Sequence, residues 1–249
     1  MSLLEAAVIV AAGFGAGTIN TVVGSGTLIT FPTLVALGYP PVVANVSNTV
    51  GLVPGSVAGA WGYRRELDGQ RSRLIRLGAA SLLGAVVGAL ALLVAPDEVF
   101  TAVVPVLIVV ACALVAIQPW LVGKLKDRPR REHGGVGVWL LVFATGIYGG
   151  YFGAAQGVLL IAVLGLGLDE TLQRVNAAKN VLAGLVNLVA SLVFVVVADI
   201  DWVVAALIAA GALLGGLAGA RVGRRLAPLA LRVVVVLVGV VAVVTMLWP

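Results

Sequence analysis

The sequence predicts an all-α polytopic membrane protein built from two inverted five-segment repeats with short broken or re-entrant helices. Of its 249 residues, 61% are hydrophobic and 11% are charged, whereas a soluble domain has about 25% charged residues. The mean hydropathy is +1.14, and apolar runs of membrane-spanning length recur along the whole chain. The basic residues gather in short loops, which is typical of a protein in a lipid bilayer rather than of one that binds nucleic acid.

The apolar runs divide the chain into ten segments, of which eight to ten would be membrane segments. Two of them, 26–37 and 157–167, are shorter than the roughly 20 residues that a spanning helix needs. Each follows a glycine-rich break, and such breaks at matching positions of two halves indicate a transporter site. The ten segments are 4–23, 26–37, 42–61, 74–95, 99–122, 136–155, 157–167, 172–198, 202–220 and 229–248. The acidic start of the first segment has no base, so we expect it to be retained rather than cleaved as a signal.

The two halves match in pattern rather than in identity. A shift of 131 positions places Gly26 on Gly157 and Asn45 on Asn176. Polar residues then recur at offsets of 3, 4 and 11 residues, which is one stripe along a helix. The stripes are Asn45, Asn48, Thr49 and Ser56 in the first half and Asn176, Lys179, Asn180 and Asn187 in the second. We therefore expect a first transmembrane repeat at 1–123, a basic linker at 124–135 and a second repeat at 136–249.

The charges of the loops predict the orientation. Loops 64–76, 124–131 and 221–225 carry the basic residues, and the Lys/Arg rule places them in the cytoplasm of a bacterial-type inner membrane. Loops on the other side carry acids and no base, namely Asp97, Glu98, Asp199 and Asp201. Both termini then lie outside, and the odd number of segments in each repeat makes the second repeat inverted.

The course of the first two segments of each repeat has two interpretations. Both segments could cross the membrane, or they could form a re-entrant hairpin or an equivalent broken helix. We prefer the hairpin because it brings the breaks at 24–27 and 151–157 to the middle of the bilayer. Non-helical backbone is tolerated at that depth only where protein buries it or where it lines a wet cavity.

Unlike the other basic residues, Lys179 lies far from the cytoplasmic end of its predicted membrane segment. It sits about eight residues, or roughly 12 Å, into its helix, and a charge at the bilayer centre costs about 3 kcal/mol on insertion scales. An ion pair with a buried carboxylate would be the simplest explanation, but every Asp and Glu falls in a loop or at a segment end. Two interpretations remain: the ammonium faces an anionic substrate, or it only binds backbone carbonyls.

The surroundings of Lys179 in the repeat favour an oxyanion over a metal ion, because they offer amides, hydroxyls and helix N-termini. The two breaks would open short helices with free N–H groups. The candidate substrate-binding residues are Ser25, Gly26, Thr27, Asn45, Asn48, Thr49, Gln156, Gly157, Asn176, Lys179 and Asn180. Ser56 and Asn187 could instead join helices to each other. No catalytic residue, metal ligand set or cofactor is predicted.

Two stretches resemble the signature regions of the TauE/SafE sulfite exporter family. The first contains GSGT and ends in ANVSNT, and the second contains YFGAAQG and ends in VNAAKN. The resemblance extends over nearly the whole chain. It implies a bacterial inner-membrane permease that exports sulfite or an organosulfonate such as sulfoacetate. In the second stretch, Ala-Gln-Gly stands where many members of the family carry a run of glycines.

The sequence therefore predicts a secondary transporter that exports a small sulfur-containing anion, and not an enzyme. Export of an anion from a negative cytoplasm is favoured by about 2.3 kcal/mol per charge at 100 mV. One alternative is an anion channel of the same fold without alternating access. A non-transporting scaffold or membrane enzyme is a third, although no nucleophile–base pair supports an enzyme. The specific anion, ion coupling and formation of a homodimer stay open.

Overall fold

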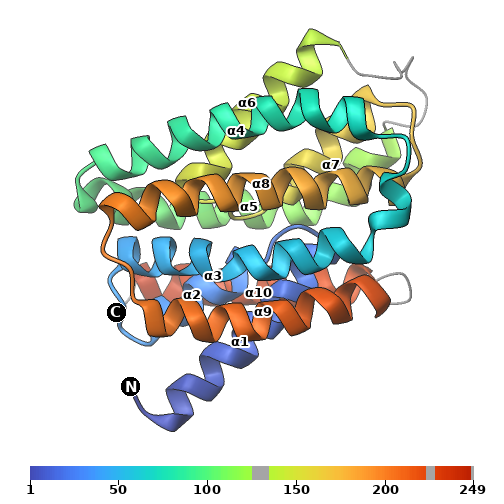
Figure 1. The fold of residues 1–249 in the computed structure, drawn as a ribbon. Coiled ribbons are helices and arrows are strands. Elements are labelled where there is room, and N and C mark those ends of the chain that lie inside the picture. Colours follow the sequence, from blue (N-terminus) through green and yellow to red (C-terminus); the bar gives the residue numbers. More distant parts are fainter. Residues whose placement is uncertain (125–134, 223–227, 248–249) are drawn as a thin grey trace.

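The computed structural model describes residues 1–124, 135–222 and 228–247, which form ten α-helices and a short 3-10 helix (Figure 1). The helices coincide closely with the ten predicted segments. Their bounds are α1 Leu3–Val22, α2 Thr27–Ala36, α3 Pro41–Gly62, η1 Arg64–Leu67, α4 Arg71–Val94, α5 Asp97–Lys124, α6 Val136–Tyr151, α7 Gln156–Gly167, α8 Leu172–Val197, α9 Trp202–Val222 and α10 Pro228–Leu247. Most of the predicted basic loops 124–131 and 221–225 lies outside the described residues.

Five helices of the described chain are long and apolar enough to cross a membrane by length and composition: α1, α4, α5, α8 and α9. Shorter apolar helices stand where the glycine-rich breaks predicted them, including α2 with 10 residues and α7 with 12. The chain is therefore an all-helical, multi-pass membrane protein. The segment predicted at 136–155 ends earlier than expected, because α6 stops at Tyr151.

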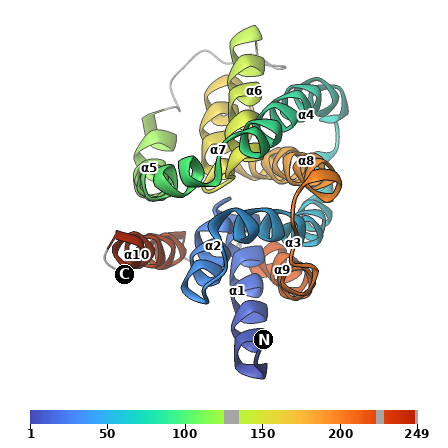
Figure 2. The same ribbon diagram turned by 90° about the vertical axis from the view of Figure 1, so that its left-hand side faces the viewer.

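The helices lie in two layers, and the layers do not follow the two halves of the sequence. Figures 1 and 2 show α1, α2, α3, α9 and α10 in one layer and α4 to α8 in the other. The chain passes between the layers at residues 63–70 and returns at 198–201. Each layer thus combines three helices from one predicted repeat with two from the other.

The two ends of the molecule differ in charge. The basic end, as we name it, contains the end of α3 and the starts of α4, α8 and α10. The acidic end contains the starts of α1, α3 and α5 and the turn between α8 and α9. Tyr39, after α2, lies near Asp201 and Glu5 at this end, where burial and then these two carboxylates raise the pKa of its phenol.

Two helical hairpins, α1–α2 and α6–α7, extend toward the centre of the molecule from its opposite ends. Helices α1 and α2 both have their outer ends at the acidic end, and they meet at the break around Gly24. Helices α6 and α7 have theirs at the basic end, where Gly167 packs against Val138. Each pair is therefore a helical hairpin, and the breaks of the two hairpins contact each other.

Glycines allow the close helix contacts inside each layer. A Cβ atom on Gly88 of α4 would lie 2.0 Å from the carbonyl oxygen of Ile147 in α6, and one on Gly215 of α9 would lie 2.0 Å from that of Phe14 in α1. Backbones approach closely through such small residues in membrane proteins. Glycine-lined faces of α4 and α9 therefore form the closest contacts with α6 and α1 that these distances describe.

Candidate functional site

The structure brings the two glycine-rich breaks together at the centre. The Gly157 N–H donates to the Gly24 carbonyl over 2.9 Å, and a Cβ atom on either glycine would lie 2.4 Å from the Cα atom of the other. Gly24 has φ +91°, a conformation that favours glycine. The sequence suggested that the N–H groups at the start of α7 are free to bind a ligand. The Gly157 N–H is not, because it already donates to Gly24.

Lys179 lies against this contact and is 1% exposed. Its side chain passes Gly157, where a Cβ atom would meet the lysine Cδ at 2.8 Å. Its Nζ then donates to the carbonyl oxygens of Asn20 at 2.8 Å and Thr21 at 3.1 Å. These carbonyls end α1, where the helix dipole is negative.

The observed contacts of Lys179 are those of the carbonyl-binding interpretation. Among the described residues, no carboxylate lies within ion-pair distance of Nζ. An ammonium group has three N–H donors, and the two carbonyls account for two of them. One donor therefore remains for a further acceptor.

The rest of the α8 stripe gathers on the same carbonyl. Asn176 and Asn180 each donate from Nδ2 to the Thr21 oxygen over 3.3 Å. Further along α8, Asn187 donates to the Ser56 hydroxyl of α3 over 3.3 Å. The first three residues of the α8 stripe thus bind the end of α1, and the fourth joins α8 to α3.

The α3 stripe is placed in a similar way, but without a charge. Asn45 donates to the Tyr151 carbonyl at the end of α6 over 3.0 Å. Asn48, which corresponds to Lys179, instead contacts Thr30 and donates to the Thr27 hydroxyl over 3.4 Å, both in α2. Asn45 therefore holds the inner end of the hairpin from the other half of the sequence, whereas Asn48 holds the start of α2 in its own half. Lys179 alone among these stripe residues brings a charge.

Several predicted site residues keep an unpaired polar atom. The buried side-chain atoms without a hydrogen-bond partner in the described residues include Ser25 Oγ, Asn45 Oδ1, Gln156 Nε2 and Asn176 Oδ1. A buried polar group without a partner costs about 1–3 kcal/mol, so such groups call for a ligand or water. Thr49 differs, because its hydroxyl donates to the Asn45 carbonyl of its own helix.

A cavity of about 180 Å³ flanks the central contact on the side of the basic end. Val22 and Val23 at the end of α1 form part of its wall, and Asn176 lines it from α8. Gln118 of α5 and Arg232 of α10 add further polar groups to its lining. The sequence pointed to Asn176 but not to Gln118, although a glutamine within an apolar segment was a signal that could have been read.

Aromatic side chains fill the opposite flank, toward the acidic end. Phe31 of α2 packs edge-on against Phe152, with ring centroids 5.2 Å apart. Phe100 of α5 lies 6.4 Å from Phe31 and 6.0 Å from Phe152, and Tyr151 borders it at 5.7 Å. Phe31 and Phe100 are completely buried. The four rings, which we name the aromatic cluster, close this flank.

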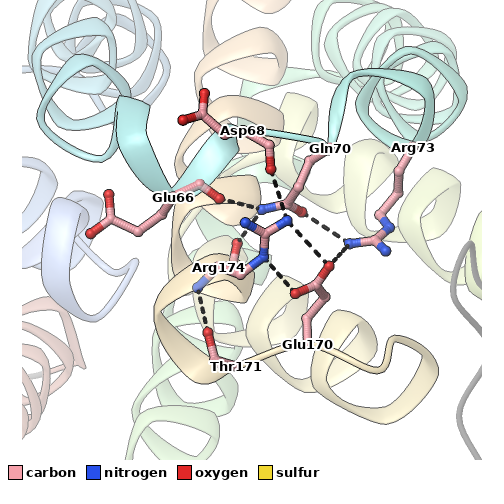
Figure 3. A network of polar contacts seen from close by, with 7 residues as sticks. All are labelled: Glu66, Asp68, Gln70, Arg73, Glu170, Thr171 and Arg174. Carbon is pink, nitrogen blue, oxygen red and sulfur yellow. Dashed lines mark hydrogen bonds and ion pairs between the residues drawn. The ribbon is translucent and has the colours of Figure 1, made fainter.

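An ionic network joins two helices of the α4–α8 layer at the basic end (Figure 3). Glu170, before α8, accepts hydrogen bonds from Arg73 Nη1 at 2.9 Å and Arg174 Nε at 2.6 Å. Burial opposes ionisation of Glu170, but the hydrogen bonds from Arg174 and Arg73 outweigh it and hold the pKa of this carboxyl below its usual range. The network fixes the start of α8 beside the start of α4.

Comparisons with known proteins agree with this architecture. The profile of the family "Sulfite exporter TauE/SafE" matches residues 9–246. The probable membrane transporter protein YfcA of Escherichia coli K12 is 26% identical over 212 residues, which are 85% of this chain and 76% of that protein. A probable membrane transporter protein of Sinorhizobium sp, ORF9, is 28% identical over 214 residues, covering 84% and 80%.

A further relative, a probable membrane transporter protein of Haemophilus influenzae, is 25% identical over 217 residues, which are 86% of this chain and 84% of that protein. No solved structure matches the chain significantly. The family profile covers the helices, both hairpins and both polar stripes described above. The chain therefore belongs to the TauE/SafE family and is a membrane transporter.

Proposed function

We propose that the protein is a secondary transporter that exports a small sulfur-containing anion, sulfite or an organosulfonate such as sulfoacetate. The family description supports this substrate class, whereas the names of the relatives do not include a substrate. The observation that carries the proposal is Lys179, a buried ammonium next to unpaired polar atoms and without a described carboxylate partner. Buried charges in membrane segments mark substrate or ion pathways.

We also propose that the two halves are inverted repeats around this site. The helix pairs support it, because they occur as counterparts: α1 packs on α9 as α6 packs on α4, and α3 packs on α9 as α8 packs on α4. The contacts of α2 with α10 and of α7 with α5 form a third such set. The hairpins from opposite ends have the polarity that an inverted repeat requires.

The proposed orientation places the basic end in the cytoplasm and both termini outside a bacterial inner membrane. The described arginines support it, since Arg64, Arg71 and Arg221 lie at the basic end, whereas Asp97 and Asp199 lie at the other. The membrane potential then drives an anion outward by about 2.3 kcal/mol per 100 mV.

In this proposal the anion competes with backbone carbonyls for the donors of α8. Lys179, Asn176 and Asn180 bind the Thr21 carbonyl when no anion is bound. An anion that arrives through the cavity takes the third N–H of Lys179 first. The exchange releases the end of α1, and the freed hairpin lets the layers rock so that the site opens toward the acidic end.

Flux measurements in proteoliposomes test the proposal. We expect saturable uptake of sulfite or a short sulfonate, driven by a positive interior, and slower flux of sulfate and thiosulfate. Lys179→Ala is expected to abolish it, whereas Lys179→Arg, which keeps the charge, should retain part of it. Normal sulfite flux in Lys179→Ala would contradict the proposed site, and flux that never saturates would indicate a channel instead.

A further inference from the structure

We propose that Arg232 and Gln118 form a second anion-binding site, at the mouth of the cavity, where the substrate binds before it reaches Lys179. This inference rests on the proposed function, but it assigns residues that the central site does not include. Arg232 lies near the start of α10 and lines the cavity together with Gln118, Gln173 and Asn176. The cavity holds about 180 Å³, which is room for several waters or a small hydrated anion.

The orientation of Arg232 supports a ligand inside the cavity. Its Nε donates to Gln118 Oε1 over 3.2 Å, and Gln118 is only 4% exposed. A guanidinium group has five N–H donors, so this bond leaves the two terminal nitrogens to receive an oxyanion as a fork. An arginine that only reached for lipid head groups would not need a buried glutamine to hold it at the cavity wall.

The charges of the cavity favour an anion. Arg232 is the charged residue among those that line the cavity. Among the described residues, no carboxylate lies within ion-pair distance of the Arg232 guanidinium. Asn176, 7% exposed, adds a neutral amide to the same cavity lining.

The cavity leads from Arg232 to the central site. Its wall includes Val22 and Val23, which directly follow Thr21, whose carbonyl oxygen binds Lys179. Asn176 belongs to both places, since it lines the cavity and donates to the Thr21 carbonyl. An anion held by Arg232 is therefore separated from Lys179 by the last turn of α1, which is the element that the proposed exchange moves.

Transport kinetics test the second site. Arg232→Gln is expected to raise KM for the transported anion about tenfold with Vmax within about twofold, because recruitment weakens while the central site stays intact. The KM of Arg232→Lys should lie between those of the wild type and Arg232→Gln, since a lysine keeps the charge but not the forked pair of donors. Arg221→Gln is the matched control, because Arg221 is an exposed arginine at the same end that does not line the cavity. An unchanged KM in Arg232→Gln, or an equal rise in Arg221→Gln, would overturn the inference.

A second measurement works without transport and so separates the two proposals. In a Cys112→Ala background, Gln173→Cys places a thiol at the exposed rim of the cavity. We expect an anionic thiosulfonate reagent to label it faster than a cationic one, and Arg232→Gln to reduce this preference about tenfold. A preference that Arg232→Gln leaves unchanged would refute the second site even if flux is normal. If the wild type transports no anion but the preference depends on Arg232, the proposed function fails and the anion site stands.

Discussion

The two flanks of the central glycine contact differ, although counterpart helices form them. Toward the basic end, the end of α1 and helices α5, α7 and α10 enclose a cavity. Toward the acidic end, the end of α6 and helices α2 and α5 bring the aromatic cluster together. Under the proposed inverted repeat, this difference is one of conformation, with a hollow flank toward the basic end and a filled flank toward the acidic end. The alternate state would exchange a filled flank for a hollow one.

The two polar stripes show a second asymmetry. Both bind the inner end of a hairpin, but α8 has Lys179 where α3 has Asn48. A single positive charge near the middle of the membrane can attract one anion and still release it when the carbonyls of α1 return. A second lysine in α3 would double the attraction and slow the release.

The largest effect is expected for Phe152→Ala, which empties the filled flank. Loss of a buried phenylalanine costs about 3–5 kcal/mol of unfolding free energy. Ile161→Ala is the matched variant on the other flank, where Ile161 lines the cavity and is also buried. We expect it to cost about 2 kcal/mol, because part of its surroundings is already empty. Denaturation in detergent compares the two, and equal losses would mean that the flanks are equally packed.

Lys179→Asn sharpens the comparison of the stripes, because it gives α8 the asparagine that α3 has. We expect anion flux to fall about 100-fold, which corresponds to the roughly 3 kcal/mol of a hydrogen bond to a charged group. Initial rates in proteoliposomes measure it. Asn187→Ala is the control on the same stripe, and its flux should stay within about twofold because Asn187 only joins α8 to α3. Flux that survives in Lys179→Asn would show that the charge is dispensable.

Gly24→Ala tests the contact between the flanks. Its left-handed φ costs an alanine about 1–2 kcal/mol, and a Cβ atom 2.4 Å from Gly157 adds about 1–3 kcal/mol of overpacking. Gly38→Ala isolates the first cost, because Gly38 has φ +89° and open space around its Cβ position. We expect the Gly24 variant to be the less stable of the two by about 2 kcal/mol in thermal unfolding. If both variants lose the same unfolding free energy, the backbones of Gly24 and Gly157 do not pack closely in the protein in solution.

Glu170→Gln is expected to have the smallest effect, about 1 kcal/mol at neutral pH. The pKa of Glu170 is lowered in the folded protein, so its contribution is present above its usual value of 4.5 and is lost as the pH falls below it. The wild type should therefore lose stability on acidification over that range more steeply than Glu170→Gln. Glu98→Gln, an exposed acid at the other end, is the control and should follow the wild type. If the stability of wild type and Glu170→Gln changes with pH in the same way, the ionic network does not stabilise the basic end.

The sequence predicted the helices and the breaks well, because both depend on local composition. Apolar length placed α3 and α8, and glycines marked the turns near Gly24 and Gly157. The hairpin interpretation predicted both breaks at the middle of the bilayer, but not their contact with each other. The partners of Lys179 could not be predicted, since the carbonyls of Asn20 and Thr21 belong to another helix and carbonyls are present in every residue. The difference between the flanks was also out of reach, because one sequence is compatible with both states.

The division of the chain between the layers affects how the molecule is assembled. Helices α4 to α8, which follow one another in the sequence, form one layer, whereas the other layer needs α1 to α3 together with α9 and α10. Since synthesis proceeds from the N-terminus, the glycine faces of α1 and α3 wait for α9 while five other helices are inserted. Such distant partners slow folding, so the early helices have to be kept from wrong associations until about the last fifth of the protein has left the ribosome.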